Sequence, residues 1–170
     1  MSVLWITLVL VALQRLGELA YAARNTRRLL AQGAVEIGRA HYPLFVLLHG
    51  GWLVAMAALV PAAAPVSWPL LALFVLLQLG RLWVVATLGP YWTTRIITLP
   101  KVPLVRRGPY RFVNHPNYLI VTGEIAVLPL AFGAWPIALV FSILNAALLF
   151  WRIRIENGTL TPRRTLGEAR

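Results

Sequence analysis

Apolar residues gather in five segments of the chain, separated by polar gaps. The segments cover residues 3–23, 44–60, 68–88, 118–132 and 135–153. A helix needs about 20 apolar residues to cross a bilayer, within a range of about 17–25. The pattern therefore predicts an all-α polytopic membrane protein with about five transmembrane helices. The fourth segment is short, so we expect it to be tilted or to form a tight helical hairpin with the fifth.

Composition supports a membrane protein. Hydrophobic residues make up 59% of the chain, charged residues make up 12%, and the mean hydropathy is +0.74. A soluble domain is about 45–50% apolar and about 25% charged. The 170 residues predict a single domain over residues 1–170. The chain has no cysteine, which excludes disulfides, thiolate catalysis and cysteine-based metal sites.

The placement of the positive charges predicts the orientation in the membrane. Apart from Arg15 and Arg81, every basic residue lies after the first segment, after the third segment, or beyond residue 151. The positive-inside rule then puts the N-terminus outside and the C-terminus in the cytoplasm, which an odd number of spans satisfies. The net charge of +11 is spread over loops between apolar runs. Nucleic acid is therefore not an expected partner.

The stretch of residues 107–118, which ends the long gap after the third segment, is rich in turn formers and aromatic residues. Pro116 suits the first position of a helix, and Asn114 is expected to cap that helix. His115 and Tyr118 then lie near the helix start, where backbone N–H groups can hold a ligand carboxylate. The alternative is a capped helix whose histidine and tyrosine only anchor it at the membrane interface.

The end of the fifth segment carries a polar stripe. Offsets of seven and eleven residues put Asn145, Arg152 and Glu156 on one helical face, with Arg154 on the opposite side. Such a stripe can line a polar cavity, in which an arginine clamps an oxygen anion and a glutamate accepts hydrogen bonds. The alternative is that Arg152 snorkels towards water with Glu156 as its partner. For Arg154 the snorkelling interpretation is favoured.

Four ionisable residues lie inside the apolar segments. Buried charges are costly, so each of them needs a partner or a polar cavity. Arg15 and Glu18 are three residues apart and are expected to pair on one helix, and Arg81 with Glu124 is the expected interhelical pair. The three histidines form no ligand pattern, so no metal site is predicted.

The polar break and the last segment together resemble a known family. The run Gly108-Pro109-Tyr110-Arg111, then His115-Pro116-Asn117-Tyr118-Leu119, an apolar hairpin, and Arg152 with Glu156 and Leu160 is similar to the isoprenylcysteine carboxyl methyltransferase family. Residues 81–83, 88–89, 92–95 and 145 resemble its bacterial branch more loosely. That branch includes enzymes that O-methylate alkylpyrones and related long-chain polyketides. The resemblance covers residues 78–160 well.

The resemblance implies a cytoplasm-facing methyltransferase site in the bacterial inner membrane, within a catalytic-like region over residues 89–160. S-adenosylmethionine would be held by Leu104, Gly108, Tyr110, His115 and Tyr118 on the loop side and by Glu156 on the last helix. A lipophilic or prenylated acceptor, with a carboxylate or a polyketide hydroxyl, would enter from the lipid. Arg152 and Asn145 would orient its oxygen. A phenol or enol acceptor would need a base, for which His115 and Glu156 are the candidates.

Two positions depart from the family motif. Asn114 stands where the motif has arginine, and Asn157 stands where it has a second glutamate. These departures leave an inactive relative of the family as one interpretation. Besides an O-methyltransferase, the alternatives are a phospholipid N-methyltransferase-like enzyme and a non-catalytic lipid-binding or scaffold protein. A small transporter is disfavoured, because the charges gather at the loops and not along a path through the membrane.

Overall fold

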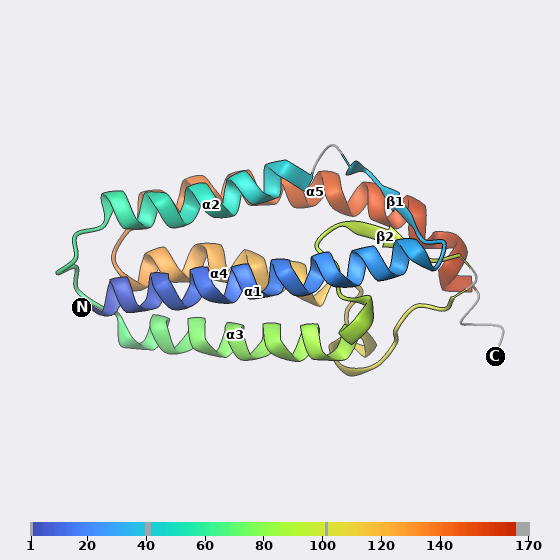
Figure 1. The fold of residues 1–170 in the computed structure, drawn as a ribbon. Coiled ribbons are helices and arrows are strands. Elements are labelled where there is room, and N and C mark those ends of the chain that lie inside the picture. The colour runs from blue at the N-terminus through green and yellow to red at the C-terminus, as the bar shows by residue number, and fades with distance from the viewer. Residues whose placement is uncertain (1, 40–41, 101, 166–170) are drawn as a thin grey trace.

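The computed structural model describes residues 2–39, 42–100 and 102–165, and five α-helices dominate this part of the chain (Figure 1). Four of these helices are long and apolar enough to cross a membrane, and the fourth in chain order is a shorter apolar helix. The five helices are α1 (Val3–Ala31), α2 (Tyr42–Leu59), α3 (Trp68–Leu88), α4 (Pro116–Ala131) and α5 (Trp135–Thr165). The prediction of a mostly helical polytopic membrane protein is confirmed. The predicted orientation of the termini stays a prediction.

The observed helix boundaries follow local sequence signals. α3 has the predicted bounds, and α4 begins at Pro116 as expected. α1 continues eight residues past the predicted end at residue 23, to Ala31. It does so because the polar side chains of this extension bind backbone carbonyls: Asn25 Nδ2 donates to Trp92 O at 2.9 Å, and Arg28 Nη2 donates to Pro90 O at 2.8 Å.

A small sheet corrects the purely helical prediction. β1 (Val35–Ile37) pairs antiparallel with β2 (Ile96–Thr98), and Glu36 lies opposite Ile97. Both strands lie at the end of the molecule that also holds the C-terminal part of α5 (Figure 1). The Glu36 carboxylate accepts hydrogen bonds from Arg95 Nη1 at 3.2 Å and Arg39 Nε at 3.1 Å, which ties the ribbon together. Three-residue strands inside polar loops give too short a period to be recognised in the sequence.

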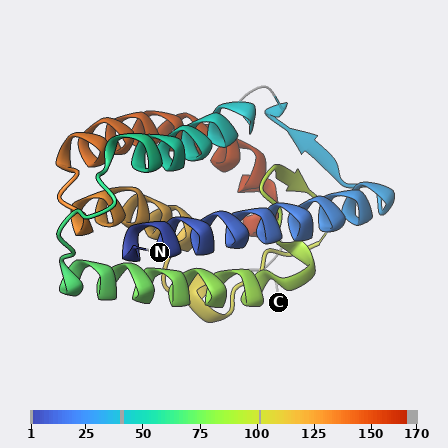
Figure 2. The same cartoon turned by 60° about the vertical axis from the view of Figure 1, so that its left-hand side comes forward.

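The apolar core fills the half of the bundle that is distant from the sheet. It joins the first turns of α1 to the last turns of α2 and α4, through side chains such as Leu4, Trp52, Met56 and Leu128. In both views α1 runs between α2 and α3 (Figure 1, Figure 2). In the half of the bundle nearer the sheet a smaller apolar cluster forms around Ala22, Val84 and Trp92, and the candidate site lies beside it.

Candidate functional site

A cluster of four ionised side chains joins α1, α3 and α4 inside the bundle. Arg81 Nη2 lies 2.6 Å from Glu18 Oε2, and Arg81 Nη1 lies 3.3 Å from Glu124 Oε2. Arg15 bridges the same two carboxylates, at 2.6 Å from Glu124 and 3.4 Å from Glu18. Both predicted pairs are confirmed, and the two pairs form one network. Its two positive and two negative charges balance, which lowers the cost of burying them.

Amide side chains complete this network. Gln78 Nε2 donates to Glu124 Oε1 at 2.8 Å, and Gln14 Nε2 donates to Glu18 Oε1 at 3.1 Å. On the loop side, Arg81 Nη1 also reaches Asn117 Oδ1 at 3.4 Å. Arg15, Glu18, Arg81 and Asn117 line a large cavity, so the network forms one wall of it.

The cavity has a volume of about 960 Å³. A polar part lies among the loop before α4, the segment before β2, and the last turns of α5, and includes Thr94, Leu104, Tyr110, His115, Tyr118, Arg152 and Glu156. The volume lies within the range of about 300–1,000 Å³ that is typical of small-molecule sites. Six of the eight predicted site residues therefore share one cavity: Leu104, Tyr110, His115, Tyr118, Arg152 and Glu156.

A chain of polar contacts joins α4 to α5 inside this cavity. Tyr118 O–H donates to the Glu156 carboxylate and accepts a hydrogen bond from Arg152 Nε at 2.7 Å. His115 Nδ1 lies 3.8 Å from Glu156 Oε2, and the His115 ring stacks on the Tyr118 ring with centroids 5.1 Å apart. Each member fixes the orientation of the next, so the contacts together define the geometry of this polar end.

Arg152 is held on several sides. Its guanidinium lies over the rings of Phe45 and Tyr118, at 5.2 Å and 5.6 Å from their centroids, and Nη2 donates to Thr94 O at 3.0 Å. Arg152 is buried, whereas Arg154 is exposed and lies over the Phe150 ring. The predicted placement of these two arginines on opposite sides of the helix is confirmed, and Arg152 does not snorkel.

Two predicted site residues lie outside the cavity wall. Gly108 has φ +55°, and a Cβ there would lie 2.6 Å from Thr87 Oγ1 on α3. Glycine at this position therefore seats the loop on α3 and does not face the cavity. Asn145 is fully buried on α5, two turns before Arg152, and its Nδ2 and Oδ1 have no hydrogen-bond partner among the described residues.

Three further placements concern the loop. His115, and not Asn114, occupies the cap position of α4, and it makes no side-chain cap hydrogen bond. The predicted capping role of Asn114 is therefore wrong: its exposed amide lies one residue too early and lines the cavity mouth.

Tyr110 is half-buried, and burial, together with the negative charge of Glu156, raises the pKa of its phenol. Tyr110 therefore stays a neutral O–H group. The side chain of Asn157 lies outside the described residues.

An apolar arm continues the cavity towards the lipid-facing surface. It lies between Ala12, Leu16 and Leu19 of α1 and Val46, Gly50 and Leu53 of α2. A shallower groove of about 270 Å³ shares Ala12 and Leu53 and extends the arm along the same two helices. The site thus combines a polar end with a long apolar groove.

Sequence reasoning missed the contribution of α2 and of the segment before β2. Tyr42, Phe45 and Thr94 surround Arg152: Thr94 Oγ1 donates to the Tyr42 hydroxyl at 3.3 Å, beside the contacts of Phe45 and Thr94 with the guanidinium. In the sequence, Thr93 and Thr94 before Arg95 indicated only weakly that this segment belongs to the site. Aromatic residues at the start of an apolar segment gave none, because they are common at membrane interfaces.

Comparison with known proteins identifies the family. Residues 70–162 match the Isoprenylcysteine carboxyl methyltransferase (ICMT) family. The chain is 38% identical over 160 residues to "Uncharacterized protein YpbQ" of Bacillus subtilis (strain 168), which covers 92% of this chain and 95% of that protein. It is 26% identical over 163 residues to an "Uncharacterized protein" of Haemophilus influenzae, which covers 92% and 94%. No solved structure matches the chain significantly.

The chain belongs to the isoprenylcysteine carboxyl methyltransferase family. Members of this family are membrane methyltransferases that generally depend on S-adenosylmethionine, which suggests a membrane methyltransferase with a lipophilic acceptor. The apolar helices and the family together indicate an integral membrane protein. The matched region holds the loop, α4 and the polar stripe of α5, whereas α1 and α2 lie before it.

Proposed function

We propose that this protein transfers a methyl group from S-adenosylmethionine to an oxygen of a lipophilic acceptor, at the cytoplasmic face of the bacterial inner membrane. One observation carries the proposal. The family-motif residues His115, Tyr118 and Glu156 meet in a cavity whose other end is an apolar groove between α1 and α2. A site for a polar donor and an oily acceptor needs both environments within one enclosure.

The polar end has the chemistry to hold the donor. S-adenosylmethionine supplies a methyl group bound to a positively charged sulfur. The Glu156 carboxylate can accept hydrogen bonds from the ammonium group or from ribose hydroxyls, and the ring of Tyr110 can offer a face to a cation. Leu104 adds apolar contact. Gly108 acts indirectly, because it seats the loop that carries these groups on α3.

Arg152 is the residue we assign to the acceptor oxygen. Its Nε and Nη2 are engaged by Tyr118 and Thr94, which fixes the plane of the guanidinium and leaves Nη1 to bind an oxygen in the cavity. Asn145, which the sequence analysis gave the same role, is buried two turns before Arg152 and does not line the cavity, so we do not assign it to the acceptor. The apolar tail of the acceptor would then run between α1 and α2.

Methyl transfer in this site depends mainly on alignment. The acceptor oxygen must approach the methyl carbon in line with the bond to sulfur, and holding two reactants in such a geometry lowers the barrier by about 7–11 kcal/mol. Arg152 on α5 and the donor site on the loop and α4 are joined through Tyr118. This connection would hold the donor and the acceptor in the alignment that methyl transfer requires.

The proposal is tested by calorimetry on the detergent-purified protein. We expect saturable binding of S-adenosylmethionine, weakened at least about tenfold, or about 1.4 kcal/mol, by Glu156→Gln. The matched control is Arg154→Ala, on the opposite side of the same helix, which should bind like wild type. Folded protein that binds no S-adenosylmethionine at millimolar concentration would overturn the enzyme assignment and favour a lipid-binding or scaffold protein.

A further inference from the structure

Arg152 takes part of its orientation from a backbone carbonyl in the short segment before β2. Arg152 Nη2 donates to Thr94 O at 3.0 Å. Residues 92–95 follow the turn η2 (Gly89–Tyr91), line the cavity and belong to no helix or strand. The position of the Thr94 carbonyl therefore depends on the side chains that hold this segment in place.

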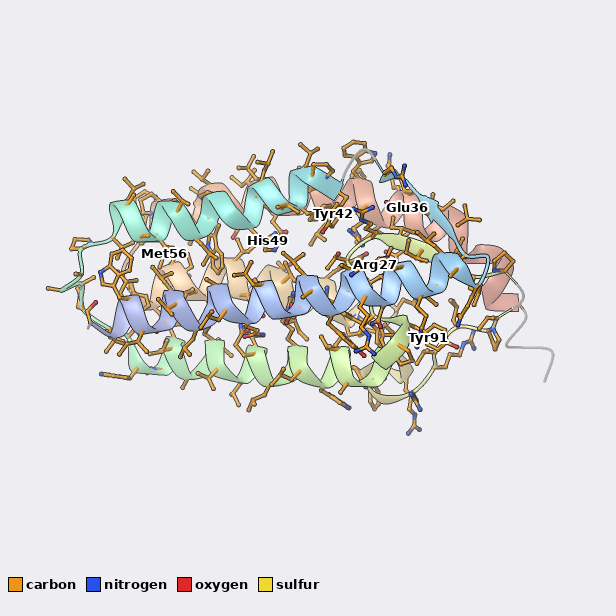
Figure 3. All side chains as sticks on the ribbon, viewed as in Figure 1. Arg27, Glu36, Tyr42, His49, Met56 and Tyr91 are labelled. Carbon is orange, nitrogen blue, oxygen red and sulfur yellow. The ribbon has the colours of Figure 1, made fainter. Side chains whose placement is uncertain are left out.

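The side chain of Arg95 anchors the segment to β1 and α2. Arg95 Nη1 lies 3.2 Å and 3.3 Å from the two oxygens of the Glu36 carboxylate on β1. The guanidinium lies over the ring of Tyr42, 4.8 Å from its centroid, and Thr94 Oγ1 donates to the hydroxyl of the same tyrosine at 3.3 Å. In Figure 3 the labelled side chains of Glu36 and Tyr42 lie at the same end of the bundle. Thr94 and Arg95 are thus held from two elements at once.

Glu36 is placed to act through this anchor and not by touching a ligand. Its side chain is only 6% exposed, and it is not among the residues that line the cavity. It comes from the connection between α1 and α2, which precedes the matched region 70–162, whereas Thr94 and Arg95 lie within that region. Both strands of the ribbon also pack against α5, the helix that carries Arg152.

The charge of Glu36 selects one arrangement of Arg95. Arg95 is 38% exposed, so without a carboxylate partner its guanidinium could turn towards water. A glutamine at position 36 would accept through one oxygen only, and its NH₂ group would compete with the guanidinium as a donor. Partly exposed ion pairs add little to stability. The pair is therefore expected to fix a position more than to hold the fold together.

We propose that Glu36 is a positioning residue for methyl transfer, which acts on Arg152 through Arg95 and the Thr94 carbonyl. This inference rests on the proposed methyltransferase function. With Nη2 bound to Thr94 and Nε bound to Tyr118, the direction of Arg152 Nη1 is fixed. Loss of the Glu36 charge releases Arg95, moves the Thr94 carbonyl and lets the Arg152 guanidinium turn. A displacement of about 1 Å in a group that aligns two reactants can lower the rate about 100-fold.

Arg39 supplies a matched control for this role. Arg39 Nε lies 3.1 Å from the same carboxylate, but the Arg39 side chain is 79% exposed. Arg39→Gln therefore removes one partner of Glu36 and leaves the pair of Glu36 with Arg95 in place. If Glu36 only staples the ribbon, Arg39→Gln and Glu36→Gln should have similar effects. If Glu36 acts through Arg95, only Glu36→Gln should disturb the site.

The first test observes Arg152 directly and needs no substrate. In protein labelled with ¹⁵N-arginine, a guanidinium that is held gives separate Nη1 and Nη2 signals, whereas one that rotates freely gives an averaged signal. Wild type should show separate signals for Arg152, assigned by their loss in Arg152→Lys. Glu36→Gln should average them, and Arg39→Gln should keep them separate. Averaged signals in wild type or in Arg39→Gln, or separate signals in Glu36→Gln, would overturn the proposal.

The second test is kinetic. It uses S-adenosylmethionine with whichever of 4-dodecylphenol and an S-farnesylated cysteine the wild type methylates. Glu36→Gln should lower kcat about tenfold or more, while the affinity for S-adenosylmethionine in calorimetry stays within about twofold. The unfolding temperature in detergent should fall by less than about 4 °C. A purely structural role would instead lower cofactor affinity and unfolding temperature along with kcat, and would contradict the proposal.

Two further outcomes separate this inference from the proposed function. Arg95→Gln removes the other half of the ion pair and should give the same spectrum and the same kcat as Glu36→Gln, so it carries the test if Glu36→Gln does not fold. Unchanged kcat in both variants would overturn the positioning role and leave the methyltransferase standing. Wild type that binds no S-adenosylmethionine would overturn the methyltransferase, and the arginine spectra would still report whether Glu36 controls Arg152.

Discussion

Arg152 Nε donates a 2.7 Å hydrogen bond to the Tyr118 hydroxyl, and this one contact joins the part of the site on α4 to the part on α5. The same hydroxyl donates to Glu156, so it is both acceptor and donor between two opposite charges. Replacing Tyr118 by phenylalanine keeps the ring stacked on His115 and removes only the bridge. Hydrogen bonds to charged groups contribute about 1.5–3 kcal/mol each.

Tyr118→Phe is therefore expected to lower kcat/KM by about 10–100-fold, because Arg152 and Glu156 lose their common partner. The unfolding temperature in detergent should fall as well, because two hydrogen bonds to charged groups are lost although the ring packing is kept. The measurement is steady-state methyl transfer to a long-chain phenol. Wild-type kcat/KM in this variant would show that the bridge does not hold the reactants in register.

Arg152→Ala should abolish turnover and leave most of the affinity for S-adenosylmethionine, because Arg152 is assigned to the acceptor oxygen. Arg152→Lys should rescue poorly, since the three N–H groups of a lysine radiate from one nitrogen and cannot span Tyr118, Thr94 and the cavity as the planar guanidinium does. Calorimetry and a turnover assay on the same preparations separate the two effects. Loss of cofactor binding in Arg152→Ala would mean that Arg152 belongs to the donor site and not to the acceptor site.

Arg81→Met is expected to destabilise the protein by about 3–5 kcal/mol, because it leaves the two buried carboxylates of Glu18 and Glu124 with Arg15 as their one remaining cation in this network. Thermal unfolding in detergent measures this. Arg154→Ala, which removes an exposed cation from α5, serves as the control. A wild-type unfolding temperature for Arg81→Met would mean that the network contributes no net stability.

Gly108→Ala should weaken S-adenosylmethionine binding at least about tenfold, since the new Cβ would meet Thr87 Oγ1 at 2.6 Å and lift the loop from α3. Adding Thr87→Ala removes the two closest atoms and should restore part of the affinity. Gly33→Ala is the matched control: it also has positive φ, but its Cβ would meet nothing within 4 Å. Equal losses in Gly108→Ala and Gly33→Ala would assign the effect to backbone strain alone.

The buried phenol of Tyr110 predicts a pH dependence. Its pKa is raised above the ordinary value of about 10, so the unfolded chain releases this proton at a lower pH than the folded protein. Stability from this group is then complete below about pH 10 and is lost as the pH rises further. Tyr110→Phe should show a smaller loss of unfolding temperature between pH 9.5 and pH 11. Parallel losses in both proteins would contradict a buried, shifted Tyr110.

The sequence predicted features that a single helix can encode. The bounds of α3, the start of α4 at Pro116, and the opposite placement of Arg152 and Arg154 all follow from local rules of periodicity and proline geometry. The ion pairs were predictable because a charge inside a span must find a partner. Their union into one network was not, because it depends on how α1, α3 and α4 pack.

Features that depend on tertiary contact escaped prediction. The sheet needs residues 35–37 and 96–98, which lie far apart in the chain, to pair. Gly108 has the turn chemistry that the sequence indicates, but its contact with Thr87 follows from the path of the loop over α3. Family motifs reveal the polar end of such a site more readily than the helices that line its apolar end.

The groove between α1 and α2 lies outside residues 70–162, the part of the chain that matches the family. The donor and the apolar tail of the acceptor would thus be served by separate stretches of sequence. Substitutions at Leu16, Val46 or Gly50 can reshape the passage for the tail without touching a residue of the matched region. Selectivity for the length and branching of the acceptor is therefore free to diverge among relatives while their donor chemistry stays constant. Exchanging the α1–α2 hairpin between two relatives would therefore be expected to exchange their selectivity for the acceptor lipid.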